Sequence, residues 1–207
     1  MDKEVERRGL SYCRYADDIA ILVSSERSAN RVLAGLMEWI PQHLKRRVNA
    51  KKSGVGRPWN GKFLGFRITG DGRIAAAKAS LDRLKANVRR AWDAQLSLPL
   101  EARIERWQRY IRGWWNYFGL CEQRRPIFAL EGWMRRHMRK YFWQRGHNRK
   151  GRENALRRLR AKPYHQKQAS GSAGAWRVAR SPMLQTVLDK ARLRRWGLYV
   201  PSDFATE

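Results

Sequence analysis

The chain has 207 residues and carries 45 Lys and Arg against 18 Asp and Glu, so its formal net charge is +27 at pH 7. Folding does not require this excess, which opposes a compact state by self-repulsion and indicates a polyanionic partner such as a nucleic acid. A disordered basic tail is excluded because 43% of the residues are hydrophobic and ten are tryptophan.

The composition argues against several other classes of protein. Cys13 and Cys121 lie far apart and lack the spacing of zinc ligands, so we expect neither a disulfide framework nor a Cys/His metal cluster. No run approaches the ~18 apolar residues of a membrane span. The charged first residues lack the apolar centre of a signal peptide. We therefore expect a cytoplasmic protein with no membrane partner.

Residues 10–24 predict a β-hairpin with Tyr15-Ala16-Asp17-Asp18 at its bend. The flanking runs, residues 10–13 and 19–23, are rich in strand formers, and Asp is a natural turn residue. Two adjacent carboxylates at such a bend suit hard divalent cations such as Mg²⁺, which activate a hydroxyl and stabilise a pyrophosphate leaving group. The alternative is a solvated turn without a ligand.

Three further elements are predicted before residue 78. Residues 25–47 predict a helix that Ser28 caps and that Pro41 breaks or kinks near its end. The other two are a short strand over 48–53 and a second hairpin, formed by 62–69 and 73–76 around Gly70-Asp71-Gly72.

From residue 78 onward, helical periodicity replaces the strand pattern. Helices are predicted over 78–96, from Pro99 to near Gly119, from Pro126 onward, and over about 182–196. Residues 169–175 are small and predict a flexible connection. The apolar stripes of the second and third helices are Ile104, Trp107, Ile111, Trp114 and Phe118, and Ile127, Leu130, Met134, Met138 and Tyr141.

Basic residues are spread through this helical part, with 21 Lys and Arg against 7 Asp and Glu from residue 81 to 160. In the third helix, Arg135, Arg136, Arg139 and Lys140 are predicted on the side opposite the apolar stripe. Basic faces on successive helices indicate a phosphate-binding surface, and a solvated face is the alternative.

The order of five motifs resembles reverse transcriptases encoded by bacterial group II introns, together with their maturase domain. The resemblance covers essentially the whole chain. The first three motifs are similar to the catalytic palm motif, the next palm segment and the hairpin that supports the primer end. The last two resemble the signature and the C-terminal part of the maturase-specific region. In chain order, the motifs are Tyr15-Ala16-Asp17-Asp18, Asn49-Ala50-Lys51-Lys52-Ser53, Phe63-Leu64-Gly65-Phe66, Arg112-Gly113-Trp114-Trp115-Asn116-Tyr117-Phe118, and Trp176-Arg177 through Ser181-Pro182.

The resemblance implies an α+β fold in two parts. Residues 1–77 are then the C-terminal half of a reverse-transcriptase palm, with a β-hairpin, a helix and strands. Residues 78–207 are a mostly α-helical thumb and maturase-specific domain. The implied function is that of the C-terminal part of an RNA-directed DNA polymerase, a nucleotidyltransferase of a mobile element with RNA-splicing maturase activity. Its implied partners are group II intron RNA and the template–primer duplex.

The resemblance also implies a catalytic role for four residues. Asp17 is a Mg²⁺ ligand and Asp18 a ligand or close supporter, while Tyr15 packs beside the primer terminus or the incoming nucleotide. Lys52 lies near the leaving phosphates, where a cation stabilises developing charge. For Lys52, a solvated side chain is the alternative.

The nucleic-acid contacts implied by the resemblance come from both parts of the chain. Phe63 and Gly65 are expected at the primer end, where the glycine allows close backbone approach, and core packing is the alternative for one phenylalanine of that motif. Arg112 and Asn116 are the candidates in the maturase signature. The aromatic residues of that signature expected in the core are Trp114, Trp115 and Phe118. The basic set of the third helix completes the expected RNA-binding residues: Arg135, Arg136, Arg139 and Lys140.

One feature departs from the family pattern. A polymerase palm needs a further Asp on a strand that precedes the hairpin, and the only Asp in residues 1–14 is Asp2, which lacks a strand pattern. We therefore expect that the chain alone does not polymerise DNA. Either a separate polypeptide supplies an N-terminal polymerase half, or the chain is a non-catalytic RNA-binding splicing cofactor or a truncated remnant. A third hypothesis is a general basic nucleic-acid-binding protein with an incidental Asp-Asp turn.

Overall fold

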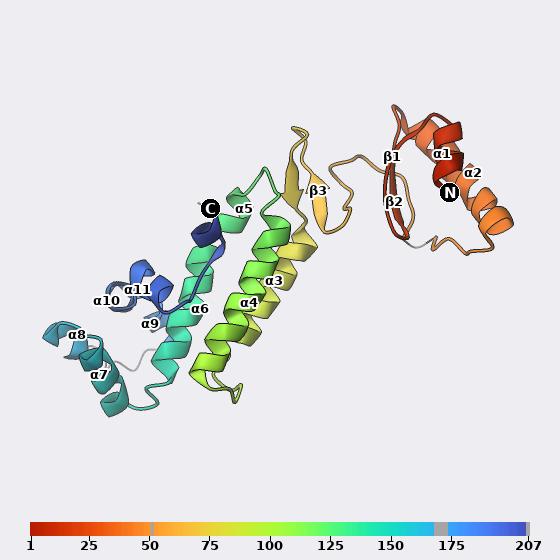
Figure 1. Ribbon diagram of the computed structural model, residues 1–207. Helices are drawn as coiled ribbons and strands as arrows, with labels where there is room; N and C mark the ends of the chain where they lie inside the picture. Colours follow the sequence, from red (N-terminus) through yellow and green to blue (C-terminus); the bar gives the residue numbers. More distant parts are fainter. Residues whose placement is uncertain (51, 168–173, 206–207) are drawn as a thin grey trace. The chain divides into compact units, whose positions relative to one another are not determined.

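The computed structural model describes residues 1–50, 52–167 and 174–205, and the chain divides into two compact units, Met1–Arg73 and Ile74–Glu207 (Figure 1). The described chain is mostly helical and has two small two-stranded antiparallel sheets. The expected combination of helices and small sheets is confirmed. Residues 169–173 of the expected flexible connection lie outside the described residues.

The first unit contains the predicted hairpin between two helices. Its strands pair antiparallel, from Ser11 opposite Leu22 to Tyr15 opposite Asp18. The turn between them holds two residues, and the first, Ala16, has the positive φ of 51° that tight hairpin turns use. The hairpin prediction is therefore confirmed. In chain order, the elements up to residue 44 are α1 (Asp2–Arg7), β1 (Ser11–Tyr15), β2 (Asp18–Leu22) and α2 (Glu26–Leu44).

Both ends of α2 have identifiable caps. The Oγ of Ser25 accepts a hydrogen bond from the backbone N–H of Ser28 at 3.2 Å, so the predicted cap is wrong by three residues. Pro41 lies in the last turn, and the helix still continues to Leu44. Lys45 then ends it in the left-handed conformation, with a φ of 50°.

The segment after α2 contradicts one prediction and confirms another. The backbone N–H groups of Lys52 and Ser53 both donate to the carbonyl of Asn49, at 2.9 and 3.0 Å. This turn replaces the predicted strand over 48–53 in the residues described there, so that prediction is wrong. The second hairpin is confirmed in a shorter form, with β3 (Phe66–Ile68) and β4 (Ile74–Ala76).

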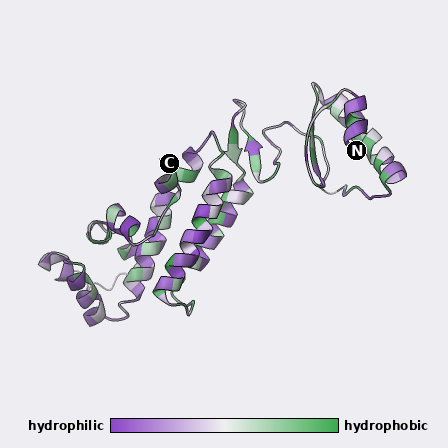
Figure 2. Ribbon diagram, in the orientation of Figure 1, coloured by the Kyte–Doolittle hydropathy of each residue, from purple (hydrophilic) through white to green (hydrophobic). Residues whose placement is uncertain are grey.

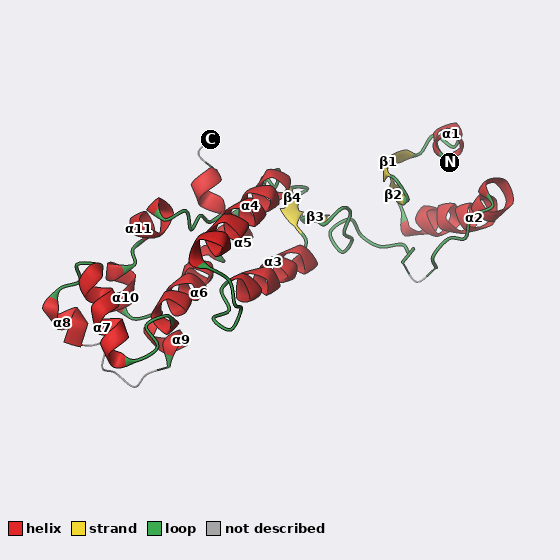
Figure 3. Cartoon of the chain, turned by 60° about the horizontal axis from the view of Figure 1, so that its bottom comes forward, coloured by secondary structure: helices red, strands yellow, loops and turns green. Residues whose placement is uncertain are grey.

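The second unit is built around three helices, α3 (Lys78–Ala91), α4 (Leu100–Phe118) and α6 (Glu131–Gln144), which lie side by side in Figures 1 and 3. Trp92, Trp107 and Tyr141 bring them together, because the Trp92 ring lies 5.7 Å from each of the other two ring centroids. All three side chains are at most 5% exposed. The shorter elements are α5 (Arg125–Phe128), α7 (Arg149–Arg158), α8 (Pro163–Lys167), α9 (Ala175–Val178), α10 (Pro182–Val187), α11 (Lys190–Arg195) and the 3-10 helix η2 (Pro201–Phe204).

Helix α4 confirms the prediction of a helix from Pro99 to near Gly119. Helix α3 ends at Ala91, before the predicted end at residue 96. The chain turns there because the buried guanidinium of Arg103 donates to the carbonyls of Ala91, Asp93 and Leu96.

Two helices predicted as continuous are each divided in the structure. The third predicted helix is α5 followed by α6, and Leu130 between them donates its N–H to the Ile127 carbonyl at 3.0 Å, a tighter turn than an α-helix makes. The last predicted helix is α10 followed by α11. The carboxylate of Asp189 accepts from the N–H of Arg192 at 2.7 Å and so starts a new helix.

A cluster of rings joins α6 to α9. The ring centroid of His137 lies 4.4 Å from that of Trp133 and 4.7 Å from that of Trp176. The guanidinium carbon of Arg136 lies 3.8 Å from the Trp176 centroid, and that of Arg89 lies 5.3 Å from the Trp133 centroid. His137 is 8% exposed, and its Nδ1 has no hydrogen-bond partner among the described residues. The imidazole is therefore best accommodated in its neutral form.

We expect this histidine to make stability depend on pH. Burial, with Lys140, Arg89 and Arg136 nearby, lowers the pKa of His137 to about 4 from its ordinary value of 6.5. As the pH falls, His137 is protonated in the unfolded chain at a higher pH than in the folded chain. The folded state therefore loses stability as the pH falls from about 6.5 to about 4. The melting temperature should fall less over this interval in His137→Phe than in the unaltered chain. Equal pH profiles for both proteins would contradict the assignment.

Candidate nucleic-acid interface

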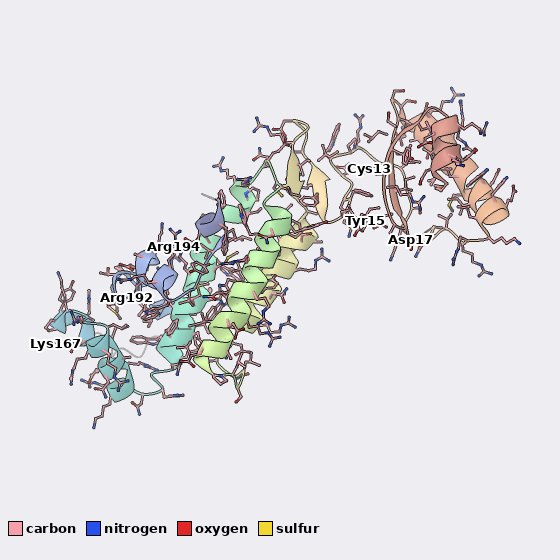
Figure 4. The ribbon with its side chains drawn as sticks, in the orientation of Figure 1. Cys13, Tyr15, Asp17, Lys167, Arg192 and Arg194 are labelled. Carbon is pink, nitrogen blue, oxygen red and sulfur yellow. The ribbon has the colours of Figure 1, made fainter. Side chains whose placement is uncertain are left out.

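The hairpin of the first unit carries three of the four predicted catalytic residues at its bend (Figure 4). Tyr15 is 66% exposed, and Asp17 and Asp18 are also exposed. Asp2 is already paired, with Arg14 at 2.6 Å. Among the described residues, no group of three or more His, Cys, Asp or Glu is placed to hold a metal ion.

The other candidates of the first unit lie in turns. The side chain of Lys52 is exposed. Phe63 and Phe66 exchange two backbone hydrogen bonds, at 3.0 and 2.9 Å. Between them, Leu64 and Gly65 have φ values of 52° and 82°, as in the tight hairpin turns that favour glycine. The local fold thus explains Gly65, and contact of this turn with a primer end stays a prediction.

The motif from Arg112 to Phe118 occupies the last two turns of α4. Arg112 and Asn116 are both exposed and lie one helical turn apart. Trp115 is 7% and Phe118 8% exposed, and Trp114 stacks on Phe118 with 4.6 Å between ring centroids. The core expectation is confirmed for Trp115 and Phe118, whereas Trp114 is partly buried. Their burial orients the helix so that Arg112 and Asn116 face solvent.

The basic residues of α6 do not form one exposed face. Arg139 is 7% exposed, and its Nε donates to the carbonyl of Leu188 at 2.9 Å. Burial lowers the pKa of Arg139. The solvent-facing position predicted for Arg139 is therefore wrong, because this side of α6 is covered by the chain after α10. Lys140 is partly exposed.

Two other basic residues of α6 hold neighbouring segments. Arg135 pairs with the buried carboxylate of Glu131 at 3.3 Å, and its side chain is only 12% exposed. Arg136 donates from Nε and Nη2 to the carbonyl of Trp176, at 3.0 and 2.8 Å, and stacks on the same residue's ring. These two side chains are engaged within the fold.

Other arginines of the second unit stabilise backbone segments between helices. Their guanidinium groups donate to carbonyls that the helix ends and connecting loops leave without partners. The donors are Arg103, Arg124 and Arg192, and the accepting carbonyls belong to Ala91, Asp93, Leu96, Gly119, Cys121 and Val187.

A second group of arginines is exposed and has no carboxylate partner among the described residues. We call it the exposed arginine set. Ion pairs in the described part of the second unit engage Lys85, Arg109, Arg135, Arg149 and Arg194 instead. Helix α7, which is hydrophilic nearly throughout in Figure 2, contributes two members. The set includes Arg106, Arg112, Arg125, Arg157, Arg158, Arg160, Arg177, Arg180 and Arg195.

Residues 81–160, from α3 through α7, match the family described as Group II intron, maturase-specific domain. This part of the chain is a group II intron maturase-specific domain. It contains the α4 motif and several members of the exposed arginine set. No curated protein matches the chain. Within the described residues, no helix has both the length and the apolar character needed to cross a membrane.

The fold places a second group of residues beside the maturase-specific domain. Arg194, Arg195, Tyr199 and Phe204, from α11 to η2, line one pocket together with Arg112 of the domain. Figure 4 labels Arg194 on α11. Sequence reasoning missed these four residues, although a basic run followed by aromatic residues is typical of nucleic-acid contacts. Only the tertiary structure brings them to Arg112.

Proposed function

We propose that the chain binds group II intron RNA through the exposed arginine set of its second unit and helps this RNA reach its splicing-competent fold. The proposal rests on one observation: the arginines in and around the maturase-specific domain fall into two groups. One group is engaged with backbone carbonyls, and the other is exposed without carboxylate partners among the described residues. The cytoplasmic location expected from the sequence belongs to the same proposal.

The chemistry of the exposed group suits RNA. Guanidinium groups are planar and always charged, and they bind phosphate through paired hydrogen bonds. A folded intron presents phosphates in fixed positions over a large surface, and recognition of such RNA depends largely on its shape. A protein surface with basic groups on several helices can follow that shape without any catalytic carboxylate.

The test is a comparison of affinities for a group II intron RNA and for a control RNA of equal length. We expect tighter binding of the intron RNA and a linear decrease of log affinity with log salt concentration. The triple variant Arg157→Gln, Arg158→Gln, Arg160→Gln should bind at least about tenfold more weakly at ~0.1 M salt. Its salt slope should be smaller by about 2, because each lost phosphate contact removes roughly 0.7–0.9.

The matched control removes three exposed arginines of the first unit: Arg27→Gln, Arg31→Gln, Arg46→Gln. It lowers the net charge equally, so equal losses in the two triple variants would contradict binding through the maturase-specific domain. Equal affinity for the intron and the control RNA would contradict a role specific to introns.

We further propose that the first unit is the end of a reverse-transcriptase palm that acts on a template–primer duplex with Mg²⁺ in a complete polymerase. The exposed Tyr15, Asp17 and Asp18 at a tight hairpin support this proposal. The described residues add no third carboxylate, so we expect no primer extension by the pure chain. A separate N-terminal polymerase polypeptide should restore synthesis, and Asp17→Asn should abolish it. Robust extension by the chain alone would contradict this assignment.

A further inference from the structure

The pocket beside Arg112 combines aromatic rings with positive charge. It has a volume of about 430 Å³, within the ~300–1,000 Å³ of typical small-ligand sites. The rings of Tyr199 and Phe204 line it, with 5.5 Å between their centroids and 59° between their planes. Three arginines also line it: Arg112, Arg194 and Arg195.

The aromatic part of the pocket is held in place by α4. The indole N–H of Trp107 donates to the carbonyl of Tyr199 at 2.9 Å, and the Gln108 amide donates to the carbonyl of Gly197 at 3.2 Å. Gly197 has a φ of 75°, so the chain reverses there without strain. These contacts fix the position of Tyr199 before any ligand binds, which reduces the ordering cost of binding.

The charges of the pocket favour an anion. Asp203 is its one carboxylate among the described lining residues, and both of its oxygens have partners within the protein. Its Oδ2 accepts from the N–H of Val200 at 2.8 Å, and its Oδ1 lies 3.8 Å from the Nε of Arg194. The side chain of Asp203 is 15% exposed and that of Arg194 60% exposed. The solvent-facing charge of the pocket is therefore positive.

A second contact joins the cationic and aromatic parts. The guanidinium carbon of Arg112 lies 5.9 Å from the ring centroid of Phe204, so the cation and the ring face the same space. Phosphate needs the guanidinium groups, whereas a base needs the flat ring. A nucleotide satisfies both requirements at once, and a base inside a duplex cannot reach a ring in this way.

We propose that this pocket binds one unpaired nucleotide of RNA, with its base stacked against Tyr199 and Phe204 and its phosphate held by Arg112, Arg194 and Arg195. This inference rests on the RNA-binding function proposed above. It extends that function from the maturase-specific domain to residues that follow the domain. It also specifies that the RNA bound in the pocket is single-stranded rather than helical.

The experiment uses the full chain and two probes: an unstructured ten-nucleotide RNA that contains the fluorescent base 2-aminopurine, and a blunt RNA duplex of the same length. The double variant Tyr199→Leu, Phe204→Leu keeps the charge and most of the apolar volume. We expect about tenfold weaker binding of the single strand, since stacking on one aromatic ring contributes on this scale. Duplex affinity should stay within twofold, and the quenching of 2-aminopurine on binding should be lost.

The control variant is Tyr117→Leu, Tyr164→Leu, which removes two exposed aromatic rings outside the pocket. An equal loss in this control, or an equal loss of the duplex in the pocket variant, would overturn the proposal. If the pocket variant fails to fold, the exposed pair Arg194→Gln, Arg195→Gln is used instead, and it should weaken binding of the single strand more than binding of the duplex. Failure of the unaltered chain to bind the group II intron RNA would refute the proposed function. Binding of both RNAs with no effect of the pocket variants would refute this inference alone.

Discussion

Replacement of Arg103 by methionine is expected to lower the free energy of unfolding by about 3–5 kcal/mol. Arg103 is 2% exposed, and its guanidinium donates to the carbonyls of Ala91, Asp93 and Leu96, the last two at 3.0 and 2.7 Å. It also lies 4.4 Å from the ring centroid of Tyr141. Methionine fills much of the same volume and supplies no donor, so three carbonyls lose their partner.

Arg106→Met on the exposed side of the same helix is the matched control. It should change stability by less than about 0.5 kcal/mol, because surface substitutions away from caps and networks have small effects. Urea unfolding followed by tryptophan fluorescence measures both variants, with equal denaturant slopes as the condition for comparison. A loss below about 1 kcal/mol in Arg103→Met would show that the turn after α3 does not depend on this side chain.

The second large effect is expected at Glu131. Glu131 is 6% exposed, and its carboxylate accepts hydrogen bonds from the N–H and the hydroxyl of Ser202, at 2.6 and 2.7 Å. It also pairs with Arg135 at 3.3 Å. Glu131→Ala leaves the Ser202 N–H and a mostly buried guanidinium unpaired, at a cost of about 2–3 kcal/mol. The segment around η2 should then become more sensitive to limited proteolysis.

Glu105→Ala is the control for this change. Glu105 also pairs with an arginine four residues later, Arg109 at 2.7 Å, and both side chains are well exposed. Exposed pairs of this kind contribute only ~0.3–0.5 kcal/mol. Similar stability losses in the two alanine variants would contradict the role of Glu131 in holding the C-terminal segment.

The N-terminal hairpin and α4 were predictable because short-range patterns determine them. The alternation of strand formers around Asp17 and the two-residue turn fix the pairing from Ser11 to Leu22. In α4, apolar residues recur at helical spacing from Ile104 to Phe118, and this stripe is the one that packs inward. The order of motifs also identified the maturase-specific domain, which the match to residues 81–160 confirms.

The ends of helices and the strand over 48–53 were less predictable from local pattern. Residues 48–53 contain one strand former, Val48, and the Asn49 carbonyl accepts two backbone hydrogen bonds that close a turn. Helix α3 ends where Arg103, from the next helix, donates to the carbonyls of Ala91 and Asp93. Local propensity is a small energy, and hydrogen bonds such as these override it.

The sequence by itself determined that this is a basic, largely helical protein with an acid-tipped hairpin and a maturase-specific domain. Charge, periodicity and motif order are properties of the sequence, and they do not depend on how the chain folds. Only the tertiary structure decided which arginines are available to a ligand. Arg139 and Arg112 were both predicted from the sequence to contact RNA. In the structure Arg139 is buried and donates to the Leu188 carbonyl, whereas Arg112 lines a pocket with Tyr199 and Phe204. That difference depends on contacts between residues far apart in the chain, because a guanidinium group is buried only where folding brings it acceptors.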